Sequence, residues 1–274
     1  ASNMALDQAL LESAVEEGFV PALRFYRWSP PSLSIGRFQP ISDVDLDTCA
    51  VKGVEVVRRP TGGKSILHLD DFTYSLVLPR SWALPRNVEA AYIVICRGII
   101  AALATVGVEA AVQCRAGEDY RDAGGACFAV ATRADLVYAG RKLCGSAQVR
   151  REGATLQHGS LFLYDRSDIL FDLLRFKSSG EKREALRAYR MRCVTLEETG
   201  ASVSWDELAV AFRSGFERAF GVSIPEGELT EGELRRWLEL KGAYRSPRWL
   251  INAESRALPS PQTFISKAGK RRDP

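Results

Sequence analysis

One stretch of the chain gathers a cysteine, a lysine and a histidine: residues 126–163 read ACFAVATRADLVYAGRKLCGSAQVRREGATLQHGSLFL. Cys127 follows Gly124 and Gly125, and such small residues let the backbone turn tightly and leave a neighbouring side chain accessible. A free thiol is mostly protonated at neutral pH, and a nearby lysine stabilises its thiolate or, when neutral, accepts its proton. Cys127 and Lys142 are therefore a candidate nucleophile and base. Most cysteines are small buried residues and most lysines lie on the surface, so a structural role stays open for both.

The elements around this pair are predicted to be strands. Apolar and polar residues alternate over residues 134–138, residues 139–140 provide a turn, and alternation resumes over residues 142–148. A third predicted strand, residues 155–164, carries His158. Three neighbouring antiparallel strands would bring the thiol, the ammonium and the imidazole into one cleft.

A loop with two adjacent glycines precedes this stretch. It reads RPTGGK over residues 59–64, between predicted strands at 54–58 and 65–67, and the second strand ends at His68. Glycine pairs allow close approach of a ligand, and backbone N–H groups in such a loop can hold an anion or a carbonyl oxygen. Glycine pairs also simply turn a chain, so the loop alone does not establish a binding site.

Helices are predicted where apolar residues recur at helical spacing, often behind a capping residue. The predicted helices are 4–17 after Asn3, 90–106, 205–220 after Ser204 and 231–242 after Thr230, and further strands are predicted at 22–28 and 32–35. The dense charges of residues 168–192 indicate a solvated face with a mobile loop at 176–183. Because strands follow one another in hairpins, the pattern predicts an α+β fold with a mixed, antiparallel-rich sheet flanked by helices.

Composition limits the classes of function. The chain of 274 residues carries a formal net charge of +3, too small to indicate nucleic-acid binding, and its pattern shows neither a membrane span nor a signal peptide. Its six cysteines have no CxxC spacing and it has two histidines, so reduced thiols are expected rather than disulfides or a metal site. The expected location is the cytoplasm.

Five segments together resemble the superfamily of lipoate-protein ligases, octanoyltransferases and biotin ligases: NMALDQALLE, PPSLSIGRFQ, RRPTGGKSILH, GRKLCGSAQVRREGATLQHGS and KGAYRSPRW. The ACF segment resembles the cysteine motif of octanoyltransferases of the LipM type. The resemblance covers most of the chain. It implies one catalytic domain with that family's fold over residues 1–255, with a helical C-terminal part at about 165–250 and a flexible tail over 256–274.

The resemblance also implies a reaction. In LipM-type enzymes a cysteine takes an octanoyl group from acyl carrier protein as a thioester and yields it to a lysine of the glycine-cleavage H protein or a lipoyl domain, in lipoate biosynthesis. Cys127 is then the nucleophile, Lys142 its partner, and no cofactor is needed. The implied substrate-binding residues are Arg59, Thr61, Gly62, Gly63, His68, Gly145, Ser146, His158 and Gly159. Backbone N–H groups of residues 62–63 or 145–146 would hold the oxyanion.

Three alternatives remain open. ATP-dependent lipoate ligases of this family typically have three consecutive glycines where this sequence has Gly62-Gly63-Lys64, generally lack the ACF cysteine and often carry an extra C-terminal domain. These departures favour thioester transfer without excluding a ligase. The other two alternatives are an amidotransferase that takes octanoyl or lipoyl from an acylated H protein through the same cysteine, and a non-catalytic module that binds acylated carrier proteins.

Overall fold

The structure, a computed structural model, describes residues 1–114 and 134–251. The elements in chain order are α1 (Ser2–Ser13), β1 (Ala22–Tyr26), β2 (Ser32–Ile35), the 3₁₀ helix η1 (Ile41–Asp43), α2 (Leu46–Val51), β3 (Glu55–Arg58), β4 (Ile66–His68), β5 (Asp71–Leu78), α3 (Val88–Thr105), β6 (Ala111–Cys114), β7 (Ala134–Tyr138), β8 (Arg141–Arg151), β9 (Ala154–Phe162), α4 (Ser167–Asp172), α5 (Ser179–Arg192), the 3₁₀ helix η3 (Glu197–Thr199), α6 (Trp205–Phe220), α7 (Glu231–Arg245) and α8 (Pro247–Ile251). Cys127, the two glycines before it and the tail at 256–274 lie outside the described residues.

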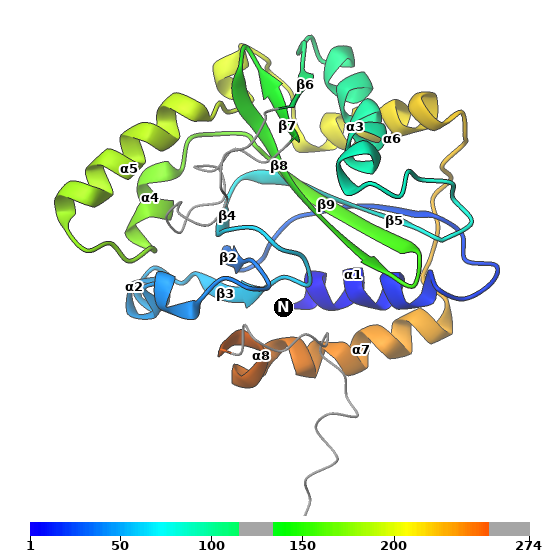
Figure 1. Cartoon of the computed structure of the whole chain (residues 1–274), viewed down its shortest axis with the longest axis horizontal. Coiled ribbons are helices and arrows are strands. Elements are labelled where there is room, and N and C mark those ends of the chain that lie inside the picture. The colour runs from blue at the N-terminus through cyan, green and yellow to red at the C-terminus, as the bar shows by residue number, and fades with distance from the viewer. Residues whose placement is uncertain (115–133, 252–274) are drawn as a thin grey trace, which may run out of the picture.

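Two sheets form the frame of the molecule (Figure 1). The larger has the order β1-β5-β9-β8-β7-β6, and each neighbouring pair is antiparallel. The smaller has the order β3-β2-β4, in which β2 is parallel to β3 and antiparallel to β4. The predicted α+β fold with a mixed, antiparallel-rich sheet is confirmed.

One face of the large sheet packs against α3 and α6, as Figure 1 shows. Alternate residues of β5, among them Phe72 and Tyr74, join Phe212 and Phe216 of α6 in the main apolar core. Among the described helices, α3 is long and apolar enough to cross a membrane. Its buried face packs in this core, and core burial accounts for that composition.

The opposite face of the large sheet packs against α1, and α7 lies along the outer side of α1 (Figure 1). Leu10 and Leu11 of α1 contact Val77 of β5 and Leu156 of β9 in a second apolar cluster. The small sheet packs on α1 as well, since Val57 of β3 joins Met4 and Ala9 of α1 in a further apolar cluster.

Two expectations about elements are wrong, and one strand is missing from the sequence prediction. The first helix begins at Ser2, before the predicted cap, and the Asn3 amide instead donates to the Arg27 carbonyl at 3.2 Å. The predicted mobile loop at 176–183 is partly helical, because the Ser178 hydroxyl caps α5 by accepting from the Glu181 N–H. The strand β5 is absent from the predicted strands, although its first six residues, DFTYSL, alternate polar and apolar, so a sequence signal was available.

A close crossing of α3 and α6 generates a stability prediction. A Cβ at Gly215 of α6 would lie 2.5 Å from the backbone nitrogen of Ala102 in α3, so Gly215→Ala forces the helices apart. We expect the free energy of unfolding to fall by about 1–3 kcal/mol, measured by urea unfolding. The control is Gly242→Ala in α7, where a Cβ meets no atom within 4 Å. That substitution should stabilise the protein by up to about 1 kcal/mol, and equal effects at both positions would contradict the packing argument.

Candidate active site

A cavity of about 390 Å³ lies between β8 and β9 on one side and the glycine loop with β4 on the other. Such a volume lies within the range of roughly 300–1,000 Å³ typical of small-molecule sites. Its lining residues are Met4, Tyr26, Trp28, Arg59, Gly62, Gly63, Ile66, His68, Thr73, Val88, Gly145, Ser146, Ala147, Gln148, His158, Gly159 and Ser160. Of the nine predicted substrate-binding residues, all but Thr61 line it, and Thr61 lies directly behind His158.

His158 links the large sheet to α1 and to the glycine loop. Its Nδ1 lies 3.0 Å from Asp7 Oδ2, and its Nε2 lies 2.6 Å from Thr61 Oγ1. Burial would raise the pKa of Asp7, but the charge of Arg24 and the hydrogen bond from His158 outweigh it, and the pKa lies below its ordinary value. Asp7 is therefore a carboxylate that accepts a hydrogen bond from the Nδ1–H group of His158, and Nε2 is hydrogen-bonded to the Thr61 hydroxyl. With both ring nitrogens engaged, His158 is placed to orient the loop.

His68 forms a second set of contacts of the same kind. Its Nδ1 lies 2.7 Å from Asp71 Oδ2, and its Nε2 lies 2.7 Å from Ser34 Oγ. Burial lowers the pKa of His68 despite the Asp71 carboxylate, so the ring is neutral at pH 7. Trp28 stacks on this ring at 4.0 Å between centroids, and its indole N–H donates to Thr73 Oγ1 at 3.0 Å. His68 thereby holds an aromatic wall of the cavity in place.

Arg59 shapes the glycine loop from within. One terminal nitrogen donates to the Ser34 carbonyl and hydroxyl, each at 2.8 Å. The other donates to the carbonyls of Gly62 at 3.0 Å and Lys64 at 2.9 Å. Gly63 adopts a φ of 102°, which favours glycine. These contacts fix the loop backbone at the edge of the cavity.

The edge of β8 borders the cavity with its backbone. Within the described residues β7 pairs with β8 only as far as Cys144, so residues 145–148 face the cavity along an unpaired edge that can donate N–H groups. Across the strand pair, a Cβ at Gly159 would clash with Ser146 Oγ and lie 2.6 Å from the Tyr74 ring. The glycine lets the Tyr74 hydroxyl reach Ser146 Oγ at 2.9 Å.

Lys142 does not line this cavity among the described residues. Its Nζ lies 2.8 Å from Asp135 Oδ1, and the two side chains are only 6% and 10% exposed. The predicted nucleophile Cys127 lies outside the described residues, so its position relative to Lys142 stays a prediction.

The described cysteines with raised pKa values are poor nucleophiles. Burial raises the pKa of Cys49 to about 11 and that of Cys144 to about 12, so both are thiols at neutral pH. Cys144 belongs to the same central motif as Lys142 and is completely buried. Among the described residues, no three His, Cys, Asp or Glu side chains are grouped to hold a metal ion.

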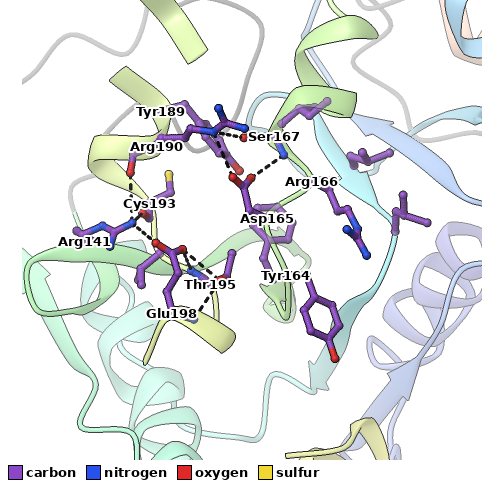
Figure 2. A pocket seen from close by; sticks show the side chains of 15 residues that line it. Arg141, Tyr164, Asp165, Arg166, Ser167, Tyr189, Arg190, Cys193, Thr195 and Glu198 are labelled. Atoms are coloured by element: carbon purple, nitrogen blue, oxygen red, sulfur yellow. Dashed lines mark hydrogen bonds and ion pairs between the residues drawn. The ribbon is translucent and has the colours of Figure 1, made fainter. Parts of the chain in front are cut away.

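A second cavity of about 140 Å³ lies between the end of β9, α4 and α5. Figure 2 shows Arg141 directed toward Glu198 and Arg190 directed toward Asp165. Arg141 donates to Glu198 Oε1 at 2.7 Å, and Arg190 donates to Asp165 Oδ2 at 3.2 Å. None of the predicted site residues lines it, and these ion pairs hold α5 and η3 against the start of β8.

Some residues of the site are absent from the sequence prediction: Asp7, Trp28, Ser34, Asp71 and Asp135. A signal was available for two of them. Asp7 lies in NMALDQALL and Asp135 lies in ADLVY, and a single carboxylate within an apolar segment indicates a buried acid with specific partners.

The Asp7 carboxylate generates a prediction that depends on pH. Asp7→Asn removes a fully buried charge that pairs with Arg24, and we expect the free energy of unfolding at pH 7 to fall by about 3 kcal/mol. Because the folded pKa of Asp7 is lowered, its contribution is fully present above pH about 4 and is lost as pH falls through the folded value. Urea unfolding of both proteins across this pH range measures the difference.

The control for that experiment is Asp206→Asn, whose carboxylate is 87% exposed and lies 3.4 Å from Arg27. We expect a change below about 1 kcal/mol there. A stability difference for Asp7→Asn that grows as the solution is acidified would contradict the assigned charge state.

Comparisons of the sequence and of the structure with known proteins all point to the same family. The model of the lipoyl protein ligase A/B catalytic domain matches residues 1–217. An octanoyltransferase LipM from Symbiobacterium thermophilum is 42% identical over 84% of this chain and 86% of that protein. Another octanoyltransferase LipM, from Exiguobacterium sp., is 37% identical over 91% of this chain and 93% of that protein. The solved structure of a bi-partite lipoate protein ligase and its E2 lipoyl domain from Thermoplasma acidophilum matches with a TM-score of 0.78 and 25% identity, over 94% of this chain and 93% of that one. The chain therefore belongs to the lipoyl protein ligase A/B catalytic-domain family, and it groups there with the LipM acyltransferases.

Proposed function

We propose that the chain is an octanoyltransferase of lipoate biosynthesis that works through a thioester on Cys127. The donor is octanoyl-acyl carrier protein, and the acceptor is a lysine of the glycine-cleavage H protein or of a lipoyl domain. The observation that carries the proposal is the cavity of about 390 Å³, into which the family motifs converge. The names of the two LipM relatives support octanoyl as the group transferred.

The cavity suits an acyl chain that ends in a reactive carbonyl. Met4, Trp28 and Ile66 offer apolar contacts for a hydrocarbon tail. The backbone edge at residues 145–148 and the loop at residues 62–63 offer N–H donors for a carbonyl oxygen. Burial lowers the pKa of His68, so its ring is neutral and the hydrocarbon tail does not have to pack against a charged group.

The transfer takes place in two steps. The Cys127 thiolate attacks the thioester carbonyl, the new sulfur–carbon bond forms, and the carrier sulfur leaves and takes a proton. The neutral amine of the acceptor lysine then attacks the acyl-enzyme, an amide forms, the nitrogen loses a proton and the cysteine sulfur is released. Backbone N–H groups stabilise the oxyanion in both steps. We place the reaction in the cytoplasm, since Cys49, Cys96, Cys144 and Cys193 are free thiols.

The acyl-enzyme is directly testable. We expect intact-protein mass spectrometry to show a gain of one octanoyl group after the chain is mixed with octanoyl-carrier protein without ATP. Cys127→Ala should abolish the gain because it removes the nucleophile. Cys144→Ala is the matched control from the same motif, and it should still gain the group, since the Cys144 thiol is buried with a pKa raised to about 12. If the Cys127→Ala variant still gains an octanoyl group, another residue carries the acyl group.

The cavity also predicts selection by chain length. The tail of an octanoyl group has about six methylenes, each worth about 0.8 kcal/mol when buried. Adding or removing one methylene should lower kcat/KM roughly 10- to 200-fold, which corresponds to about 1–3 kcal/mol of lost transition-state stabilisation. Rates of acyl-enzyme formation with carriers that hold hexanoyl, octanoyl and decanoyl chains measure this, and a flat profile argues against a closed acyl pocket.

An ATP-dependent lipoate ligase is the second candidate. The match to a bi-partite lipoate protein ligase at a TM-score of 0.78 favours it. The same experiment separates the two functions, because a ligase forms no acyl-enzyme from the carrier and modifies the acceptor only when lipoate, ATP and magnesium are added. Lys64, in place of a third glycine, favours the transferase.

A further inference from the structure

An irregularity in the large sheet decides where Lys142 points. Leu136 of β7 pairs with Cys144 of β8, but the next residue, Val137, pairs with Lys142, so β8 carries one extra residue at this point. Such a β-bulge breaks the alternation of side chains between the two faces of a strand and can redirect a side chain.

The bulge places Lys142 on the face opposite that of Cys144. Leu136 and Cys144 both belong to the core beneath α3 and α6. Val137 follows Leu136 in β7 and so faces the other side, and its partner Lys142 shares that face. Without the bulge, Lys142 and Cys144 would share a face, since they are two residues apart.

That opposite face is the face of the cavity. Gly145 follows Cys144 and pairs with Ser160, whose hydroxyl donates to Asp71 and which lines the cavity. Asp135 precedes Leu136 in β7, so it too lies on the cavity face. The ion pair between Asp135 and Lys142 joins two side chains that the register places together.

The start of β8 is held from its other edge as well. The Val194 N–H donates to the Lys142 carbonyl at 3.0 Å. The Arg141 guanidinium donates to the Cys193 carbonyl and to the Glu198 carboxylate (Figure 2). The backbone of Lys142 is therefore fixed, and Asp135 fixes its charged end.

We propose that Asp135 is the positioning residue of Lys142: its carboxylate holds Nζ as a fixed ammonium at the cavity face, so that Lys142 serves acyl transfer as a cation and not as a proton acceptor. The inference rests on the proposed function of this site. A carboxylate within hydrogen-bond distance favours the charged form of an amine, and a fixed positive charge stabilises a thiolate and a developing oxyanion. Removing the carboxylate would help a lysine that must be neutral and would harm one that must stay charged.

The test compares Asp135→Asn, Lys142→Met and the double variant. We expect Asp135→Asn to lower the maximal rate of acyl-enzyme formation by about 100-fold, because a misplaced catalytic group costs that order of rate. The carrier concentration at half-maximal rate should stay unchanged. In a double-variant cycle, adding Asp135→Asn to Lys142→Met should cause no further loss, because Asp135 acts through Lys142. The matched control, Glu239→Gln, removes the carboxylate of the Arg236 ion pair on α7, away from the start of β8, and should keep the wild-type rate.

Two results would overturn the proposal. One is an Asp135→Asn rate equal to or above that of the wild type, as a neutral lysine base requires. The other is an additive loss in the double variant. If circular dichroism shows that Asp135→Asn does not fold, Asp135→Glu carries the test. It keeps the charge but displaces it, and its rate should lie between those of the wild type and Lys142→Met, whereas a wild-type rate refutes positioning.

A separate readout distinguishes failure of this inference from failure of the proposed function. Alkylation of Cys127 by iodoacetamide at pH 7, followed by peptide mass mapping, needs no acyl donor. We expect Asp135→Asn and Lys142→Met to slow alkylation equally. If the wild type accepts no octanoyl group but both variants are alkylated more slowly than it, the proposed donor is wrong and the inference stands. If both variants are alkylated at the wild-type rate, the inference is wrong.

Discussion

The candidate site depends on one buried charge, the carboxylate of Asp7, which has no exposure to solvent. A carboxylate can be buried only where donors replace its water, and Arg24, Tyr26 and His158 supply them from β1 and β9. Those donors are fixed in a sheet, so α1 can lie against it in one orientation. The hydrogen bond between His158 and Thr61 then holds the glycine loop beside the cavity.

The cavity combines polar supports with apolar surfaces. The ring nitrogens of His68 and the terminal nitrogens of Arg59 are hydrogen-bonded to Ser34, Asp71 and loop carbonyls. They shape the walls of the cavity and leave Trp28 and its neighbours to contact a ligand. Such an arrangement is rigid because these hydrogen bonds are buried and losing one of them would be costly. It also explains why Arg59 and His68, which the family motifs mark as binding residues, mainly hold the protein around the cavity in place.

A local irregularity of β8 has a comparable effect on charge. Regular pairing would place Lys142 in the apolar core with Cys144, where an ammonium would have to be buried beside α3. The bulge turns it toward Asp135 and the cavity face. The sheet is similar to that of a solved lipoate protein ligase, and under the proposed function single residues such as Cys127 and Lys64 would distinguish a transferase within this fold.

The sequence by itself determined the elements whose signals are local. The hairpin of β7 and β8 follows from alternation and the turn at residues 139–140, and α6 and α7 begin where Ser204 and Thr230 form capping boxes. Motif spacing also marked the residues that converge on the cavity. Only the tertiary structure decided the partners of these residues, because His158 and Asp7 are 151 positions apart and no local pattern encodes such a pairing. It likewise decided the direction of Lys142, because a bulge is a property of two paired strands.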